Sequence, residues 1–133
     1  MINHNIKEGL TYKYSKVTSS TDAYLSNDST FDYLVSTPAI LNMIIGVSAK
    51  MLDSLLPNDY VTVGKEIQLS HDNPTIIGET IEIIVKVEKV DGNKIYLDIV
   101  GNDSQGICLS GKYQRVIVNK EKLNQAAFFR IKL

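Results

Sequence analysis

The strongest constraint on the fold is a stretch of alternating side chains that ends in a turn signal. Apolar residues recur at every second position from Ile81 to Val87, and Glu82, Lys86 and Glu88 lie between or beside them. A period of two is typical of a β-strand with one face on a core and the other in water. Residues 80–90 therefore predict one strand of an antiparallel sheet.

The following residues predict that the chain reverses direction. Asp91-Gly92-Asn93 supplies the positive-φ chemistry of a hairpin turn, and the apolar face resumes at Ile95, Leu97 and Ile99. Residues 102–106 indicate a second reversal. Similar patterns, rich in valine and isoleucine, occur at residues 10–17, 60–70, 94–100 and 107–118. We therefore expect an antiparallel sheet of about five strands.

One long helix is predicted after residue 36. Ser36 or Thr37 can cap the exposed amides of its first turn, and Pro38 suits the first helical position because it has no N–H to leave unpaired. Side chains 39–47 are apolar on every side except Asn42, so we expect the helix to be buried at its beginning and wetter toward its end. Pro57 ends it after about five turns.

One long helix and one antiparallel sheet predict an α+β domain in which the sheet curls around the helix. The 133 residues suffice for a single domain, with residues 119–133 as a C-terminal extension. That extension could form a short helix that packs against the body or against a second subunit, because it is too apolar for a free tail. Residues 18–30, rich in Ser, Thr, Asn and Asp, predict a mobile surface segment.

Composition excludes several classes of function. A net charge of −1 with interspersed signs leaves no basic stripe for a nucleic acid. Residues 39–47 are too short to cross a membrane, and the first ten residues lack the pattern of a signal peptide, so we expect a cytoplasmic protein. Cys108 is the only cysteine, and we expect it to be a small buried or half-buried side chain rather than half of a disulfide.

Several short motifs resemble one known family in their order and spacing. They are Thr37-Pro38-Ala39 at the helix start, Val63-Gly64 in the next strand, His71, Gly78, and Arg115-Val116-Ile117 in the last strand. Over residues 12–122 the chain resembles the thioesterases typified by fluoroacetyl-CoA thioesterase. The resemblance implies a hot-dog fold, an acyl-CoA thioester as substrate and a homodimer. Coenzyme A would enter as part of the substrate, and nothing indicates a metal or a bound redox cofactor.

The resemblance also implies an active site with one departure. The family places a threonine at the helix start, a glutamate eight residues further along the helix, and a histidine at the end of the next strand. Thr37 and His71 match the first and third, although a helix cap and a core histidine bonded to a backbone carbonyl would explain them structurally. The residue eight positions after Thr37 is Ile45, which cannot attack a thioester, accept a proton or orient water.

Two further matches lie near the predicted helix. Phe31 stands six residues before Thr37, where the family has an aromatic lid over the acyl chain, and packing beneath a loop would explain it equally well. Asn42 lies one turn before Ile45 and could polarise a carbonyl or hold a water, but an amide cannot act as a base at neutral pH. The alternative for Asn42 is a buried polar group that is satisfied across a helix or dimer contact.

The last two matches lie on strands. Gly64 corresponds to a glycine near the acyl group, but it falls on the opposite face of a regular strand from His71. The two can line one pocket only if a bulge lies between them. Arg115 corresponds to an arginine near the pocket mouth, and its alternative is a cross-strand salt bridge with Glu82 or Asp98.

Three functions follow for this site. In the first, His71 activates water to hydrolyse a small or medium acyl-CoA, Thr37 and a backbone amide stabilise the oxyanion, and Ile45 and Met43 shape an acyl slot. In the second, the pocket binds an acyl-CoA or another apolar ligand without turnover, as the missing glutamate favours. A hot-dog hydratase fits less well, because those enzymes space an aspartate and a histidine within one loop, whereas Asp72 directly follows His71. We favour the thioesterase assignment.

Overall fold

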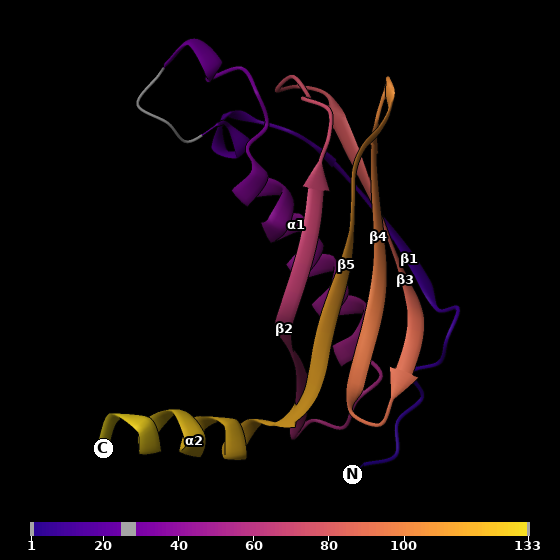
Figure 1. The fold of residues 1–133 in the computed structure, drawn as a ribbon, viewed down its shortest axis with the longest axis vertical. Coiled ribbons are helices and arrows are strands. Elements are labelled where there is room, and N and C mark those ends of the chain that lie inside the picture. Colours follow the sequence, from indigo (N-terminus) through magenta and orange to yellow (C-terminus); the bar gives the residue numbers. More distant parts are fainter. Residues whose placement is uncertain (1, 25–28, 133) are drawn as a thin grey trace.

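The computed structural model describes residues 2–24 and 29–132 and contains one antiparallel sheet. Its five strands follow the order β1-β3-β4-β5-β2, where the strands are β1 (Thr11–Val17), β2 (Tyr60–His71), β3 (Thr80–Asp91), β4 (Lys94–Asp103) and β5 (Gly106–Asn119). Helix α1 (Thr37–Asp53) packs on one face of the sheet, and helix α2 (Lys120–Lys132) follows β5 (Figure 1). The predicted α+β architecture is confirmed.

The core lies between α1 and the inner face of the sheet. The predicted apolar faces of β3 and β4 are confirmed, because every one of their side chains is at most 1% exposed: Ile81, Ile83, Val85, Val87, Ile95, Leu97 and Ile99. Ile40, Ile44 and Leu52 of α1 complete the same cluster. Burying each such side chain contributes about 1.5–3 kcal/mol. Gly92 and Gly106 have φ angles of 62° and 120°, which confirms the two predicted reversals.

The start of α1 is fixed by a serine cap. The hydroxyl of Ser36 accepts a hydrogen bond from the amide of Ala39 at 3.1 Å. The helix therefore begins at Thr37, and Pro38 is its second residue rather than its first, as was predicted. The expectation that the beginning of the helix is buried holds on one side only, where Ala39 and Ile40 are buried. Thr37 and Pro38 are exposed and Ile45 is 44% exposed, because the sheet covers only one side of α1.

Strand β2 forms one edge of the sheet and contains a bulge. It pairs with β5 from Tyr60 to His71, and its other side has no partner strand in the part of the chain that the structure describes. The register shifts between Gly64 and Glu66, so Lys65 is an extra residue. Because of this bulge, Gly64 and His71 lie on the same, inner face of the sheet, although a regular strand would place them on opposite faces.

The segment between β1 and α1 is partly packed against the body. Thr18 is 3% exposed and its hydroxyl donates to the carbonyl of Glu79, whereas Asp22 is 5% exposed and forms an ion pair with Lys16 at 2.7 Å. The prediction of a surface segment is therefore wrong for Thr18 and Asp22, which satisfy their polar groups in the interior. Residues 25–28, at the centre of that predicted segment, lie outside the described residues.

Helix α2 confirms the predicted short C-terminal helix but contacts the body little. The amide of Lys120 donates to the carbonyl of Asp59 at 2.9 Å, which ties the start of α2 to the end of the sheet. Phe128 and Phe129 are each 63% exposed and Ile131 is 79% exposed. Of the two expected arrangements, packing of these side chains against the body is therefore not observed.

Two simpler expectations concern Cys108 and membrane insertion. Cys108 is free and 0% exposed, which confirms the prediction of a small buried side chain. No helix within residues 2–24 or 29–132 is long and apolar enough to cross a membrane.

Candidate functional site

Thr37 and His71 lie side by side at the start of α1. The Oγ1 atom of Thr37 is 2.9 Å from the Nδ1 atom of His71. Thr37 begins α1 and His71 ends β2, so the packing of the helix beside the edge strand joins residues 34 positions apart. Because Ser36 caps the helix, the hydroxyl of Thr37 is available for His71. His71 therefore bonds to the Thr37 hydroxyl and not to a backbone carbonyl, as it would if it were only a core histidine.

The environment of His71 favours its neutral form. Partial burial removes water from the ring and lowers the pKa of His71 below its ordinary value of about 6.5, although the neighbouring Asp72 carboxylate acts in the opposite direction. Its Nε2 atom is buried and has no hydrogen-bond partner among the described residues. A neutral imidazole at pH 7 can accept a proton from a water or hydroxyl. The pair thus has the chemistry of a general base beside a hydroxyl.

No carboxylate completes the pair. Ile45 follows Thr37 by eight positions, which is about 80° around the helix axis and two turns along it. Asp72 accepts a hydrogen bond from the hydroxyl of Ser70 at 2.5 Å. Among the described residues, no Asp or Glu forms a hydrogen bond with Thr37 or His71. In the same ranges, no cluster of His, Cys, Asp and Glu could hold a metal ion.

Arg115 lies in a buried polar cluster at the other end of α1. It is 4% exposed, its Nε atom donates to Thr62 Oγ1 at 2.8 Å, and its Nη1 atom donates to Tyr113 Oη at 2.7 Å. The hydroxyl of Thr62 in turn donates to the carboxylate of Asp53 at 2.7 Å. The cluster therefore holds the last turn of α1 against β2 and β5.

The salt bridge expected for Arg115 is not formed. Arg115 points to the inner face of the sheet, and Asp98 pairs with Lys112 instead. Glu82 has no ion pair with Arg115 within the described residues. This alternative is excluded because Arg115 pairs with the buried Ile95 and shares its core face, whereas Glu82 and Asp98 lie on the other face of the sheet.

Gly64 makes room for the ring of Tyr113. A Cβ atom at Gly64 would lie 2.5 Å from Tyr113 Oη, so only glycine fits beside this hydroxyl. Gly64 is seven positions before His71 on β2, which corresponds to roughly 20 Å. Within one chain, the structure therefore does not bring Gly64 and Arg115 to the Thr37–His71 pair.

This close fit predicts the effect of a single methyl group. Gly64→Ala should lower the free energy of unfolding by about 1–3 kcal/mol in urea denaturation, because the methyl group displaces a hydroxyl that Arg115 holds. The same substitution should cost less in a Tyr113→Phe background, which lacks that oxygen. Equal costs in the two backgrounds would contradict the steric explanation.

The other predicted binding residues are distributed around α1. Phe31 ends a short 3₁₀ helix (Ser29–Phe31), lies edge-to-face on Tyr24 with ring centroids 5.8 Å apart, and is 42% exposed. Asn42 is exposed rather than buried. Met43 and Ile45, which were expected to shape an acyl slot, lie on different sides of α1, since Met43 is 6% exposed and Ile45 is 44% exposed.

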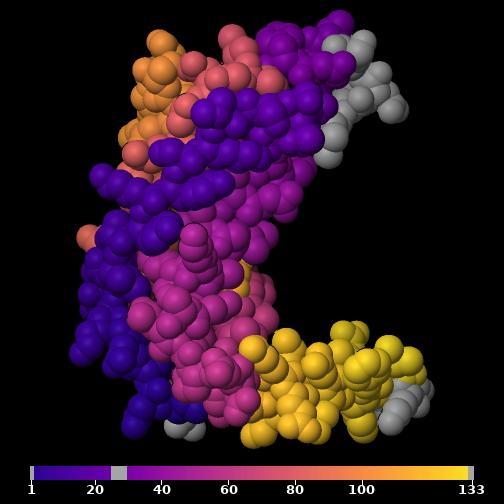
Figure 2. Space-filling view, turned by 180° about the vertical axis from the view of Figure 1, so that it is seen from behind, coloured from indigo at the N-terminus to yellow at the C-terminus, as the bar shows by residue number. Residues whose placement is uncertain are grey.

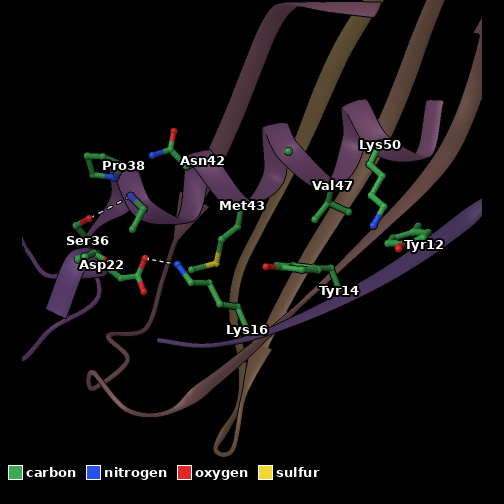
Figure 3. Close-up of a pocket in the computed structure, with 13 residues that line it drawn as sticks. Tyr12, Tyr14, Lys16, Asp22, Ser36, Pro38, Asn42, Met43, Val47 and Lys50 are labelled. Atoms are coloured by element: carbon green, nitrogen blue, oxygen red, sulfur yellow. Dashed lines mark hydrogen bonds and ion pairs between the residues drawn. The ribbon is translucent and has the colours of Figure 1, made fainter. Parts of the chain in front are cut away.

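A cavity of 540 Å³ lies between α1 and β1 (Figure 3). Met43, Val47 and Lys50 point from the helix toward the strand that carries Tyr14, and the Lys16–Asp22 ion pair closes one end. Of the residues predicted for the site, Asn42 and Met43 line this cavity, and Asn42 lies on its outer rim. The sequence analysis did not predict that β1 lines this cavity, although Tyr12, Tyr14 and Lys16 alternate along the strand and so share one of its faces.

Comparison with known sequences identifies the family. The family model described as fluoroacetyl-CoA-specific thioesterase matches residues 17–121. The chain belongs to this thioesterase family. The matched range contains Thr37, His71, Gly64 and Arg115, and it also contains Ile45. No curated protein matches the sequence significantly.

Solved structures confirm the hot-dog fold of this family member. A hot-dog-like protein from Thermanaerovibrio acidaminovorans is similar at a TM-score of 0.87 with 25% identity, covering 92% of this chain and 91% of the other. A fluoroacetyl-CoA thioesterase is similar at 0.83 with 17% identity, covering 97% and 98%. A mutant of that thioesterase in complex with acetyl-CoA is similar at 0.84 with 14% identity, covering 94% and 98%.

Proposed function

We propose that this protein hydrolyses a small to medium acyl-CoA thioester at Thr37 and His71. The observation that carries the proposal is the 2.9 Å contact between the two side chains at the start of α1, in a chain that belongs to a thioesterase family. The acetyl-CoA complex of a structural relative supports a CoA thioester as the substrate class.

In this mechanism, His71 accepts a proton from a water molecule as the water oxygen attacks the thioester carbonyl carbon. The Thr37 hydroxyl and a backbone amide at the positive end of α1 stabilise the oxyanion. His71 then gives its proton to the departing sulfur, which releases the free acid and the CoA thiol. Without a carboxylate at position 45, this reaction lacks a group whose assistance is typically worth about 10²–10⁴-fold.

A second function remains in competition because of Ile45. An isoleucine where the family has a glutamate favours a protein that binds an acyl-CoA or another apolar ligand without cleaving it. The two functions differ in one observable, since both predict binding of a CoA ester and only the enzyme predicts release of a thiol.

We also propose that the working unit is a homodimer joined at the β2 edges. A two-fold axis between identical edge strands makes them antiparallel, which would bring the partner's Gly64 and the partner's Arg115 toward His71. The 44% exposed Ile45 and the 36% exposed Ile67 of β2 are apolar side chains that such a partner could bury. A cytoplasmic location is likewise our proposal, supported by the unpaired, buried Cys108.

The lowered pKa of His71 predicts the pH dependence of the reaction. kcat/KM should be constant above about pH 6.5 and should fall as the pH drops through the lowered pKa, because protonated His71 cannot act as a base. Neutral His71 also contributes stability that is present above its unfolded pKa and is lost as the pH falls below it. A rate that stays constant as the pH falls below 6.5, down to the pH at which the protein unfolds, would exclude His71 as the base.

The proposed function is tested with a panel of acyl-CoA esters of two to ten carbons. Release of free thiol above the uncatalysed rate, for at least one ester, is the expected result. If no ester is cleaved while CoA esters still raise the melting temperature, the proposal of an enzyme is wrong and the proposal of a binding protein is supported. If neither cleavage nor stabilisation occurs, both functions fail.

A further inference from the structure

Helix α2 exposes apolar side chains that its own chain does not cover. Phe128, Phe129 and Ile131 are 63%, 63% and 79% exposed. Figure 1 shows α2 running from the end of β5 past β2, away from the rest of the sheet. In Figure 2 the helix projects from the body, and a hollow separates it from the segment before α1. A helix in this position needs a partner to bury these side chains.

The hydrogen bonds at the start of α2 show from which end of β2 this helix projects. Asn119, the last residue of β5, is paired with Tyr60, the first residue of β2. The amide of Lys120 bonds to the carbonyl of Asp59. Helix α2 therefore leaves the sheet at the Tyr60 end of β2, opposite the end that carries His71.

A second copy would reverse this relation. This step rests on the homodimer of the proposed function, in which the two β2 strands are antiparallel. The Tyr60 end of one strand then lies beside the His71 end of the other. Helix α2 of one copy thus projects toward the partner's Thr37 and the partner's His71.

The length of α2 matches the distance it must span. Strands are spaced about 4.8 Å apart, so the partner's β2 lies about 10 Å from β5. The 13 residues of α2 span about 20 Å, and Phe128 and Phe129 lie about 12–14 Å from its start. These two aromatic side chains therefore fall beyond the partner's edge strand, whereas Leu123 does not reach it.

The charges of the two surfaces are complementary. Helix α2 carries four basic residues and one acidic residue, and Arg130 lies beside the two aromatic residues. Asp32 and Asp72, near the start of α1 and the end of β2, are exposed and form no ion pair within the described residues. A second copy of this chain therefore supplies both the apolar and the charged complement.

We propose that α2 of each copy covers the Thr37–His71 site of the other, with Phe128 and Phe129 as the covering side chains. An apolar cover in this place shields the catalytic pair from bulk water and strengthens the hydrogen bonds that hold the thioester oxygen. The site is then complete only in the dimer.

Cross-linking between copies tests this arrangement without any need for turnover. A chain with Phe129→Cys is coexpressed with a differently tagged chain carrying Asp72→Cys, and the purified complex is treated with a short bismaleimide. The buried Cys108 is the shared background. We expect a cross-link between the two tagged chains. The matched control replaces Asp72→Cys with Lys13→Cys, an exposed position on the opposite edge strand β1, and should give none. No product, or equal product with the control, overturns the proposal.

Complementation in trans tests the functional consequence. Phe128→Ser with Phe129→Ser should lower kcat/KM at least about five-fold, whereas Leu123→Ser, in the part of α2 that does not reach the partner, should have little effect. A heterodimer of this double variant with a His71→Ala chain has one intact histidine, beside an intact α2 from the other chain. Its activity should recover to about half that of the native dimer. No recovery assigns α2 to its own site and overturns the proposal, whereas a cross-link without any thioesterase activity contradicts only the proposed function.

Discussion

Replacing His71 with alanine should lower kcat/KM for acyl-CoA hydrolysis about 100-fold or more, because the substitution removes the base that accepts the proton of the attacking water. Thr37→Val should also reduce the rate, since it removes the hydroxyl that holds both His71 and the developing oxyanion. Thr37→Ser keeps the hydroxyl and should retain most of the activity. The measurement is thiol release under steady-state conditions, for each variant and for the double variant.

The control for this prediction is the other histidine of the chain. His4 bonds to the carbonyl of Gly92 at 3.2 Å, far from Thr37, so His4→Ala should leave kcat/KM within about two-fold of the native value. Because Thr37 and His71 act as a unit, the double variant should be little slower than His71→Ala alone. A native rate in His71→Ala, or fully multiplicative effects, would show that the pair does not work together.

Restoring a carboxylate on α1 should have the opposite effect. Ile45→Glu is expected to raise the rate of hydrolysis by about 10²-fold or more. The substitution supplies a general base or nucleophile at the position on α1, eight residues after Thr37, where the family has a glutamate. The side chain at position 45 is 44% exposed, so a charged group does not have to be buried in the single chain. Thiol release from the best ester of the panel measures the gain.

Glutamine separates the chemistry of the new residue from its shape. Ile45→Gln has nearly the same size as the glutamate but no basic oxygen at neutral pH, so its rate should stay near that of the native protein. If glutamate and glutamine raise the rate equally, polarity at position 45 matters rather than basicity. If neither changes the rate, position 45 does not face the thioester.

The sequence predicted the elements of the fold well where local patterns determine them. The alternation in β3 and β4 placed seven side chains on the core face, and all seven are buried. The Ser-Thr-Pro start of α1 and the glycine turns follow from backbone chemistry that acts over a few residues. The pairing of Thr37 with His71 was predicted through a family resemblance, because the residues are 34 positions apart.

Other features depend on contacts that no local pattern records. The bulge at Lys65 decides which face Gly64 occupies, and it is set by the register with β5. Arg115 bonds to Thr62 of β2 and Tyr113 of β5, and Thr62 in turn bonds to Asp53 of α1, so this cluster is known only when the three elements are packed. The uniformly apolar residues 39–47 gave no stripe to show which side of α1 the sheet covers, and for that reason the exposure of Ile45 was missed.

The most direct test of the central claim is a nuclear magnetic resonance titration of the two histidine rings with a CoA thioester. The chain has only two histidines, so the ring resonances of His71 and His4 can be assigned from His4→Ala alone. Acetyl-CoA should shift the resonances of His71 in a saturable manner and leave those of His4 in place, whether or not the ester is cleaved. If saturating acetyl-CoA and longer acyl-CoA esters leave the His71 resonances unchanged, the Thr37–His71 pair is not the site of a thioester.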